Sequence, residues 1–465
     1  MDNQLIRHKR KIHLSATQKI ALSFAMMIFV GSILLSLPIA NKTVPRTYID
    51  NLFIATSCVC VTGLTPFTVV DQYNLFGQLV MMVLIQFGGL GFLSFLYLFL
   101  NAARRTIKLQ TKLVFTEALN QDSLSNLPRL LKTIFYYTAF IESFGMIVLS
   151  FFFVPKYGFV KGIYYGLWHS ISGFCNAGFD LIGGNSFIDY ATHPIINFII
   201  PFLIITGGIG FIVILDMYDK FKKEKSRHDD FHLKRYIKSL AVHSKLALSM
   251  TAILLVSGTV LFIALEFNNV KTIGTLSIPN KLAVSFFQSV TTRTAGFATV
   301  SMFNLNRITK TVMCIFMFIG GSPASTAGGV KTVTIALVIL MLKSVFKGQE
   351  ETSVFRRRIK KRIFLKAFSI VSIGLILCLI SIMILVAIEP KLDVLNIMLE
   401  VFSAFGTVGL SADVTPALNF FGKVIDIILM YAGRIGPVTL MILFTRQAHI
   451  KEKGIRYPDE DVIVG

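Results

Sequence analysis

Long stretches without a charged side chain constrain this chain more than any other feature. Residues Ile20–Ala40 and Phe368–Ile388 contain no Asp, Glu, Lys or Arg. A helix of about 20 apolar residues crosses a hydrocarbon core of roughly 30 Å. Charged residues make up 15% of the 465 residues, whereas a soluble domain carries about 25%. The sequence therefore predicts an all-α membrane protein and excludes a soluble globular protein, a disordered chain and a secreted disulfide scaffold.

Apolar segments of spanning length recur along the whole sequence. Eight are expected to cross the membrane, at residues 18–40, 75–101, 132–154, 194–217, 246–267, 308–342, 363–388 and 419–445. A shorter, half-polar segment that ends in a glycine turn lies between the two members of each pair, at residues 48–66, 163–180, 280–298 and 393–412. Apolar runs of about 10 to 14 residues suit helices that enter the membrane and return.

Two glycine motifs repeat in register with these segments. The first is Val61-Thr-Gly63-Leu, Asn176-Ala-Gly178-Phe, Thr294-Ala-Gly296-Phe and Thr407-Val-Gly409-Leu, whose glycines are 115, 118 and 113 residues apart. The second lies 24 to 29 residues later, at Gly88-Gly89, Gly207-Gly208, Gly320-Gly321 and Gly433-Arg434. Two motifs in register indicate four tandem units, each a span, a re-entrant helix, a glycine turn and a span.

The distribution of basic residues predicts the orientation of these units. Lys and Arg are about three times as frequent in the N-terminus, the loops between units and the C-terminus as in the other connections, and such an excess marks cytoplasmic segments. Both termini are therefore expected in the cytoplasm. The net charge of +21 and the cluster Arg356–Arg362 are interpreted as a cytoplasmic face beside a lipid bilayer, and no nucleic acid is expected to bind.

This orientation gives a division of the chain into six segments. They are a cytoplasmic N-terminus at 1–17, pore unit 1 at 18–101, unit 2 at 102–217, unit 3 at 218–342, unit 4 at 343–445 and a cytoplasmic C-terminus at 446–465. Units 2, 3 and 4 each include the cytoplasmic loop that precedes them.

A glycine turn after a re-entrant helix has a specific use in a membrane. Irregular backbone is tolerated at membrane depth only where protein buries it or where it lines a water-filled path. Glycine allows φ values that are closed to other residues, so the turn can aim its carbonyl oxygens at a central axis. Four such turns around a pseudo-fourfold axis would make rings of carbonyls that replace the hydration shell of a cation. The repeat therefore predicts an ion pore.

The four-unit plan with these filter motifs resembles the Trk/Ktr/HKT superfamily of potassium transporters, over essentially the whole chain. Because no further spans precede unit 1, the chain is most similar to the KtrB-type membrane subunit of bacteria. The resemblance implies potassium translocation across the plasma membrane. It also implies a homodimer that rests on a cytosolic, nucleotide-binding regulatory ring of the KtrA/KtrC kind, so that this chain itself binds no nucleotide.

The resemblance also implies that the first motif forms a selectivity filter. The residues assigned to it are Val61, Thr62, Gly63, Leu64, Asn176, Ala177, Gly178, Phe179, Thr294, Ala295, Gly296, Phe297, Thr407, Val408, Gly409 and Leu410. In plant members a serine at the first filter glycine accompanies Na⁺ transport, so four glycines imply K⁺, with Na⁺ as a second candidate ion. Asp180 and Arg293 flank the motif in one unit each, which predicts an uneven filter.

The sixth span differs from the other spans because it contains four glycines and a proline. Each interior Gly costs about 1 kcal/mol against Ala in a helix, and Pro about 3, so the helix is expected to break. A packing kink would account for this composition, but the resemblance implies a mobile gate beneath the filter. The residues assigned to it are Gly320, Gly321, Ser322, Pro323, Ala324, Ser325, Thr326, Ala327, Gly328, Gly329, Lys331 and Arg434.

Arg434 stands where the other three units have the second glycine of the pair. A charge at mid-span costs several kcal/mol unless it meets a wet cavity or a partner. Snorkelling to lipid headgroups is the alternative. The resemblance implies a positive charge near the pore that contacts the gate loop, slows cations and holds the loop closed.

Several other residues in the apolar segments receive no chemical role. The acids Glu142, Glu400 and Asp426 suit either a cation or proton path or pairing between helices, and the second is favoured. Phe87, Phe92 and Phe211 are interpreted as packing residues. The five cysteines lack the spacing of a metal site and are expected to be buried thiols.

Other function classes fit the sequence less well. No His-Glu-x-x-His, nucleophile or Walker motif occurs in the chain, which argues against an enzyme. An ion-coupled secondary carrier of another solute remains the alternative, because carriers also use repeats and broken helices. Their repeats are commonly inverted, whereas the four units here run in the same direction.

Overall fold

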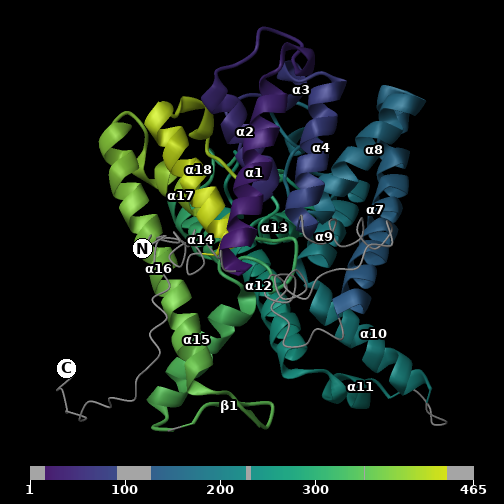
Figure 1. Cartoon of the computed structure of the whole chain (residues 1–465), viewed down its shortest axis with the longest axis vertical. Helices are drawn as coiled ribbons and strands as arrows, with labels where there is room; N and C mark the ends of the chain where they lie inside the picture. The colour runs from purple at the N-terminus through teal and green to yellow at the C-terminus, as the bar shows by residue number, and fades with distance from the viewer. Residues whose placement is uncertain (1–15, 92–126, 227–231, 350, 437–465) are drawn as a thin grey trace, which may run out of the picture.

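The computed structural model describes residues 16–91, 127–226, 232–349 and 351–436. Helices dominate this part of the chain and stand side by side as a bundle (Figure 1). The main helices of the first half are α1 (Ala16–Ser36), α2 (Tyr48–Cys60), α4 (Leu75–Leu90), α7 (Leu127–Tyr157), α8 (Phe159–Phe174), α9 (Pro194–Gly208), α10 (Phe211–Lys225) and α11 (Leu233–Ser239). Those of the second half are α12 (Val242–Glu266), α13 (Ile278–Thr291), α14 (Arg307–Phe318), α15 (Thr332–Phe346), α16 (Lys361–Ile388), α17 (Val394–Gly406) and α18 (Phe420–Ile435).

Short elements complete the described chain. They are the helix α3 (Val69–Gln72), the 3-10 turns η1 (Pro38–Ala40), η2 (Ile188–Tyr190) and η3 (Thr415–Ala417), and the antiparallel hairpin of β1 (Ser353–Val354) and β2 (Arg357–Arg358). The hairpin, α10 and α11 project from the lower end of the bundle in Figure 1.

Four described helices, α1, α7, α12 and α16, are long and apolar enough to cross a membrane, and α9 with α10 would make a fifth span if the bent pair counts as one. On α16, large side chains such as Leu379 and Met383 are exposed, as expected of a lipid-facing helix. The described part of the predicted span 75–101 is α4, and that of 419–445 is α18; residues 92–101 and 437–445 lie outside the described part of the chain. The count of eight spans therefore stays a prediction.

The predicted span 194–217 is wrong as a single straight helix. The chain turns by 90° between α9 and α10. Gly210 has φ of +100° at this point, a conformation that side chains other than glycine rarely adopt. The amide of Phe211 donates to the carbonyl of Ala324 at 2.8 Å instead of continuing the helix. Contact with a distant segment therefore decides where this helix ends.

The four short helices α2, α8, α13 and α17 lie at the centre of the bundle. Each begins a few residues from a predicted re-entrant segment and ends directly before a filter motif. The long helix after each motif packs on the short helix of the next unit: α4 on α8, α9 on α13, α14 on α17, and α18 back on α2. The fourth unit thereby closes on the first, and the four units form a ring.

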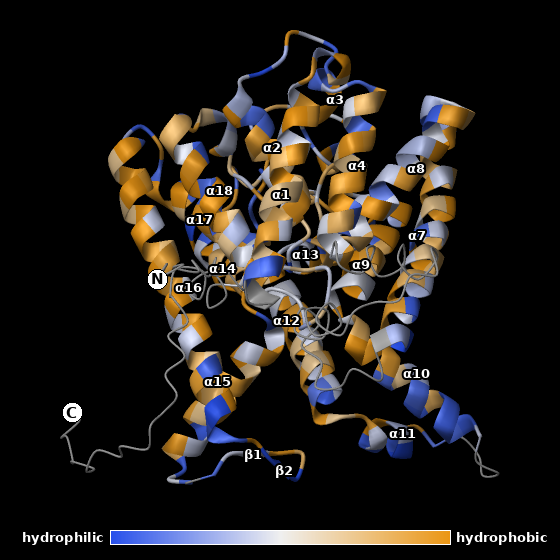
Figure 2. Cartoon of the chain, viewed as in Figure 1, coloured by the Kyte–Doolittle hydropathy of each residue, from blue (hydrophilic) through white to orange (hydrophobic). Residues whose placement is uncertain are grey.

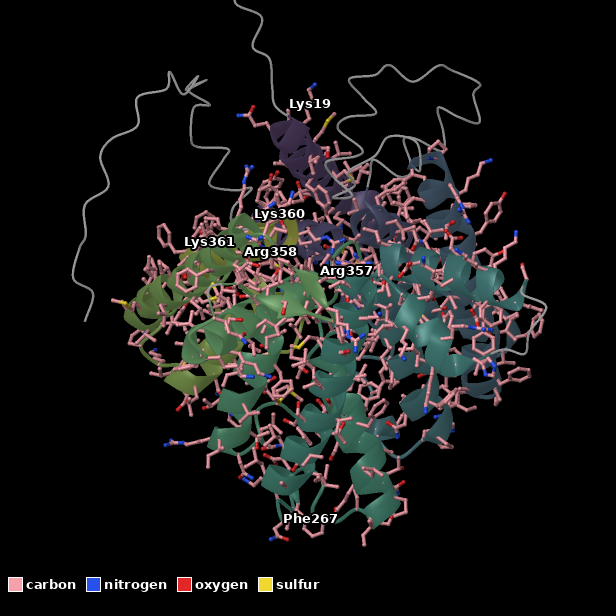
Figure 3. The ribbon with its side chains drawn as sticks, turned by 90° about the horizontal axis from the view of Figure 1, so that it is seen from below. Lys19, Phe267, Arg357, Arg358, Lys360 and Lys361 are labelled. Carbon is pink, nitrogen blue, oxygen red and sulfur yellow. The ribbon has the colours of Figure 1, made fainter. Side chains whose placement is uncertain are left out.

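Polar and apolar residues separate along the height of the bundle. Figure 2 shows apolar residues on the long helices and hydrophilic residues gathered at the lower end, on α10 and around the β1–β2 hairpin. Seen from below, Arg357, Arg358, Lys360 and Lys361 lie close to one another (Figure 3). This separation agrees with a bundle that stands in a bilayer with a basic end in water.

Candidate functional site

The four filter motifs adopt one backbone conformation. The residue two positions before the glycine is left-handed in every unit, with φ of +58° at Val61, +61° at Asn176, +66° at Thr294 and +52° at Thr407. The glycines also have positive φ, from +71° at Gly178 to +95° at Gly63 and Gly409. Non-glycine residues rarely have positive φ, so its recurrence at four equivalent positions marks one designed turn.

The four glycines meet one another around a ring. A Cβ atom placed on Gly63 would lie 2.5 Å from the carbonyl oxygen of Ala177, and one on Gly178 would lie 2.6 Å from that of Ala295. The same position on Gly296 is 2.6 Å from the Val408 oxygen, and on Gly409 it is 2.2 Å from the Thr62 oxygen. Each glycine therefore faces the carbonyl that precedes the next filter glycine, and no side chain fits there.

Hydrogen bonds from the short helices hold the turns in two related ways. In units 1 and 4 the hydroxyls of Ser57 and Ser403 accept from the amides of Gly63 and Gly409, both at 3.0 Å. Unit 3 has Val290 at the equivalent position, and there Thr291 donates to the carbonyl of Phe297 at 2.7 Å. The filter is fourfold in backbone but not in side-chain support.

Two further features complete the filter. Trp168 Nε1 of α8 donates to the carbonyl of Phe179 at 3.0 Å, which fixes the direction of that carbonyl. The side chains that follow the four glycines are buried, with exposed fractions of 1% or less, at Leu64, Phe179, Phe297 and Leu410. The sixteen residues predicted for the filter are thus gathered in one place, with apolar side chains behind the backbone.

A cavity of about 550 Å³ opens on one side of the glycine ring. All four filter glycines line it, together with Asp180 and Asp413, and no Lys, Arg or His is among its lining residues. The carboxylate of Asp180 also accepts from the amide of Ile182 at 3.1 Å. Two carboxylates without a neighbouring cation raise the local concentration of cations at the mouth of the filter.

The second glycine motif has a packing role that the repeat alone does not reveal. A Cβ on Gly88 would lie 2.2 Å from the carbonyl of Val59, one on Gly207 1.9 Å from that of Phe174, and one on Gly433 1.8 Å from that of Phe405. In each case the carbonyl belongs to the residue four positions before the filter glycine. These glycines let the long helix touch the end of the short helix, which explains the constant offset between the two motifs.

Residues 319–331, here called loop 319–331, interrupt the sixth predicted span between α14 and α15. Ile319 and Val330 form a parallel bridge, and the amide of Gly320 donates to the carbonyl of Val330 at 2.8 Å. A Cβ on Gly328 would lie 2.1 Å from the hydroxyl of Thr407 in the filter of unit 4. The loop therefore lies directly against the filter, on the side away from the large cavity.

Loop 319–331 is bonded to the bend between α9 and α10. The amide of Ser322 donates to the carbonyl of Gly208 at 2.9 Å, and that of Thr326 to the carbonyl of Gly207 at 3.3 Å. These two carbonyls end α9 and have no donor within their own helix. The loop satisfies them.

Arg434 joins the loop to two other units. Its guanidinium donates to the carbonyl of Thr326 in the loop and to the carbonyl of Gly88 in unit 1, and it donates to Gly89 at 3.1 Å. The hydroxyl of Thr326 in turn donates to the carbonyl of Phe174 in unit 2 at 3.1 Å. The contact between Arg434 and the loop that the sequence predicts is confirmed, and snorkelling to the headgroups is not observed.

Two more cations lie near the loop. Lys331 is the residue before α15, and its ammonium donates to the carbonyls of Ala327 and Gly328. Arg293 of unit 3 is 3% exposed and donates to Thr251 at 3.3 Å. Within the described residues neither these two nor Arg434 forms an ion pair. Three positive groups without carboxylate partners lie on this side of the filter, opposite the acidic cavity.

The buried acids are divided between structural and unexplained positions. Glu142 accepts two hydrogen bonds from Gln86 and so links α7 to α4. Glu400 accepts from Ser411 at 2.6 Å and from Thr415. Asp426 is fully buried, and neither of its oxygens has a hydrogen-bond partner in the described chain. The five cysteines are buried free thiols, as the sequence predicts.

Comparisons with known proteins agree with this geometry. Residues 5–453 match the family model TrkH, described as a cation transport protein. The chain belongs to this family. It is a membrane cation transporter and not an enzyme. The all-α fold is also that of the potassium transporter TrkH from Vibrio parahaemolyticus, with a TM-score of 0.72 at 19% identity over 94% of this chain and 86% of that one.

Two relatives of similar length are more alike in sequence. The chain is 38% identical to the Ktr system potassium uptake protein B of Bacillus subtilis, over 98% of both chains. It is 37% identical to the potassium/sodium uptake protein NtpJ of Enterococcus hirae, over 99% of this chain and all of that one. The family resemblance that the motifs predict is thereby confirmed.

Proposed function

We propose that this chain takes up potassium ions across the plasma membrane of a bacterial cell, through a filter made by its four glycine turns. The closed ring of glycines and neighbouring carbonyls carries this proposal, because a ring of oxygen dipoles can replace the water around a dehydrated cation. The names of the two relatives, which include potassium and sodium uptake, support K⁺ as the main ion and Na⁺ as a second one.

Loop 319–331 and Arg434 form the gate in this proposal. The loop lies against the filter and is held by units 1, 2 and 4 through Arg434, Gly208 and Phe174. Backbone hydrogen bonds of this kind can open and re-form as the loop moves. The positive charges of Arg434, Arg293 and Lys331 would oppose a cation that leaves the filter while the loop is closed.

The quaternary arrangement and orientation follow from the family. A homodimer would rest on a cytosolic, nucleotide-binding ring, which contacts the basic lower end of the bundle, and this chain would bind no nucleotide. Both termini, which lie outside the described residues, would be cytoplasmic. The excess of Lys and Arg at the lower end supports this orientation.

The test is uptake of K⁺ or Rb⁺ in a bacterial strain that lacks its own potassium uptake systems. We expect this chain to restore growth at low K⁺, and a candidate regulatory subunit to increase the rate. Rb⁺ uptake that requires a cotransported organic solute would contradict the proposal and favour an ion-coupled carrier. Purified protein in vesicles provides the same measurement without other cellular proteins.

A further inference from the structure

The bend between α9 and α10 transmits any movement of α10 to loop 319–331. A Cβ on Gly210 would lie 2.6 Å from the carbonyl of Pro323, so the loop is in close contact with the bend. The amide of Phe211, the first residue of α10, donates to Ala324 at 2.8 Å. Helix α10 cannot change its angle to α9 without altering these contacts.

Helices α10 and α11 move as one body. The carboxylate of Glu224 pairs with Arg235, and Tyr236 donates to the carbonyl of Met217 at 3.2 Å. Phe221 and Tyr236 meet edge to face with their ring centres 6.3 Å apart. We call this pair, residues 211–225 and 233–239, the α10–α11 hairpin.

The hairpin carries a basic face whose charges are not balanced by its own acids. All three acids of α10 are engaged: Asp216 accepts from Ser244 at 2.6 Å, Asp219 pairs with Arg129, and Glu224 pairs with Arg235. Six lysines of the hairpin form no ion pair among the described residues, namely Lys220, Lys222, Lys223, Lys225, Lys234 and Lys238.

Apolar side chains are exposed among these lysines. Tyr218 is 59% exposed, Leu233 60% and Ile237 49%. Leu233 and Ile237 are four residues apart and so share one face of α11, and Lys234 and Lys238 share the adjacent face. Exposed apolar groups beside lysines are typical of a helix that lies in a membrane–water interface.

We propose that the α10–α11 hairpin binds the anionic lipid headgroups of the cytoplasmic leaflet and thereby holds loop 319–331 in its closed position. A helix that leaves a membrane span at 90° runs along the membrane plane, where lysines reach phosphates and apolar side chains enter the headgroup layer. The structure has the loop against the filter with α10 at this angle, so lipid binding favours the closed state. The proposal rests on the gate role assigned above.

The experiment measures K⁺ flux into vesicles that contain only this protein and either phosphatidylcholine alone or phosphatidylcholine with one quarter phosphatidylglycerol. We expect the wild-type flux to be roughly fivefold lower with the anionic lipid, within the usual range of a coupling between two sites. The triple variant Lys222→Gln, Lys223→Gln, Lys225→Gln should carry the same flux in both vesicles, because its hairpin no longer attracts the headgroups.

A matched variant, Arg356→Gln, Arg357→Gln, Lys360→Gln, removes the same charge near the β1–β2 hairpin, which has no recorded bond to the loop. It should keep the wild-type ratio, and it corrects for the higher cation concentration at an anionic surface. An equal ratio for wild type and the α10 variant, or a ratio that falls equally in both variants, would overturn the proposal. So would an α10 variant that alters only the response to an added regulatory protein in neutral vesicles. Absence of wild-type flux in neutral vesicles would count against the proposed function instead.

Discussion

The carbonyl oxygen of Thr62 lies 2.2 Å from the point that a Cβ atom on Gly409 would occupy. These two residues are at opposite ends of the sequence repeat, and their contact closes the ring of four units. The same relation joins each filter glycine to the unit that follows it. A side chain at any one of these positions must displace a carbonyl that the proposed filter uses.

Gly63→Ser should weaken the preference for K⁺ over Na⁺. The new side chain would push against the carbonyl of Ala177, only 2.5 Å from its Cβ, and Gly63 has a φ of +95° that serine rarely adopts. Competition of Na⁺ with Rb⁺ uptake measures the effect. Gly184→Ala is the control, because its Cβ would meet nothing closer than 3.6 Å in the same cavity. Unchanged competition in the serine variant would count against the filter assignment.

Deletion of residues 322–327 should raise K⁺ flux and make it less dependent on a regulatory subunit. It removes the part of the loop that bonds to Gly207 and Gly208. A milder change, Thr326→Val, removes only the hydroxyl that donates to Phe174, and it should raise flux by a smaller factor. Surface expression of folded protein is measured in parallel. Folded variants with normal, fully regulated flux would show that the loop is a structural kink.

Arg434→Ala should raise flux by about fivefold or more, as expected of a lost coupling of 1 kcal/mol or more. The change removes a positive charge and frees the carbonyls of Thr326 and Gly88. Arg434→Lys keeps the charge but loses the planar fork that reaches two units, so its flux should be intermediate. Combined with the loop deletion, Arg434→Ala should add little, because both changes act on one barrier. Additive increases would place the action of Arg434 elsewhere in the pore.

Neutralising the acids of the large cavity should raise the KM for K⁺ without changing the maximal rate. Asp413→Asn and Asp180→Asn each remove one negative charge from the mouth of the filter, and a roughly twofold increase in KM per charge is expected at low ionic strength. The effect should vanish at high salt, because exposed charges are then screened. A KM that is equally raised at all ionic strengths would indicate a structural defect instead.

Gly207→Ala should reduce the stability of the fold, whereas Gly208→Ala should not. The Cβ at residue 207 would lie 1.9 Å from the carbonyl of Phe174, but the nearest atom to a Cβ at residue 208 is 3.6 Å away. Overpacking of this kind costs about 1 to 3 kcal/mol. The two neighbours thus form a matched pair, and the melting temperature in detergent measures the difference. Equal melting temperatures would contradict the packing role of the second glycine motif.

The sequence repeat predicts most of this architecture because both glycine motifs have a local signature. The left-handed turn at Thr407 and Gly409 needs glycine or a short loop wherever the chain lies, so its position can be read along the sequence. The constant offset to Gly433 was also visible, although only the contact with Phe405 explains it. Such features depend on residues close in sequence or on an exact repeat.

The bend at Gly210 could not be predicted in the same way. The motif Gly207-Gly208-Ile-Gly210 parallels Gly88-Gly89-Leu-Gly91, and neither reveals where the helix turns. Only the bond between Phe211 and Ala324, more than 100 residues apart, shows what ends α9. The reach of Arg434 to Gly88 in unit 1 is likewise a property of the closed ring, which no single segment contains.

The ring of four glycine turns lies within one polypeptide, and this has a consequence for how its properties can change. In a pore built from four identical chains, one codon change alters all four positions at once. Here a mutation at Gly63 leaves Gly178, Gly296 and Gly409 as they were, so selectivity can drift by one quarter of the ring at a time. Unequal support, such as Ser57 in one unit and Val290 in another, is the trace that such independent inheritance leaves.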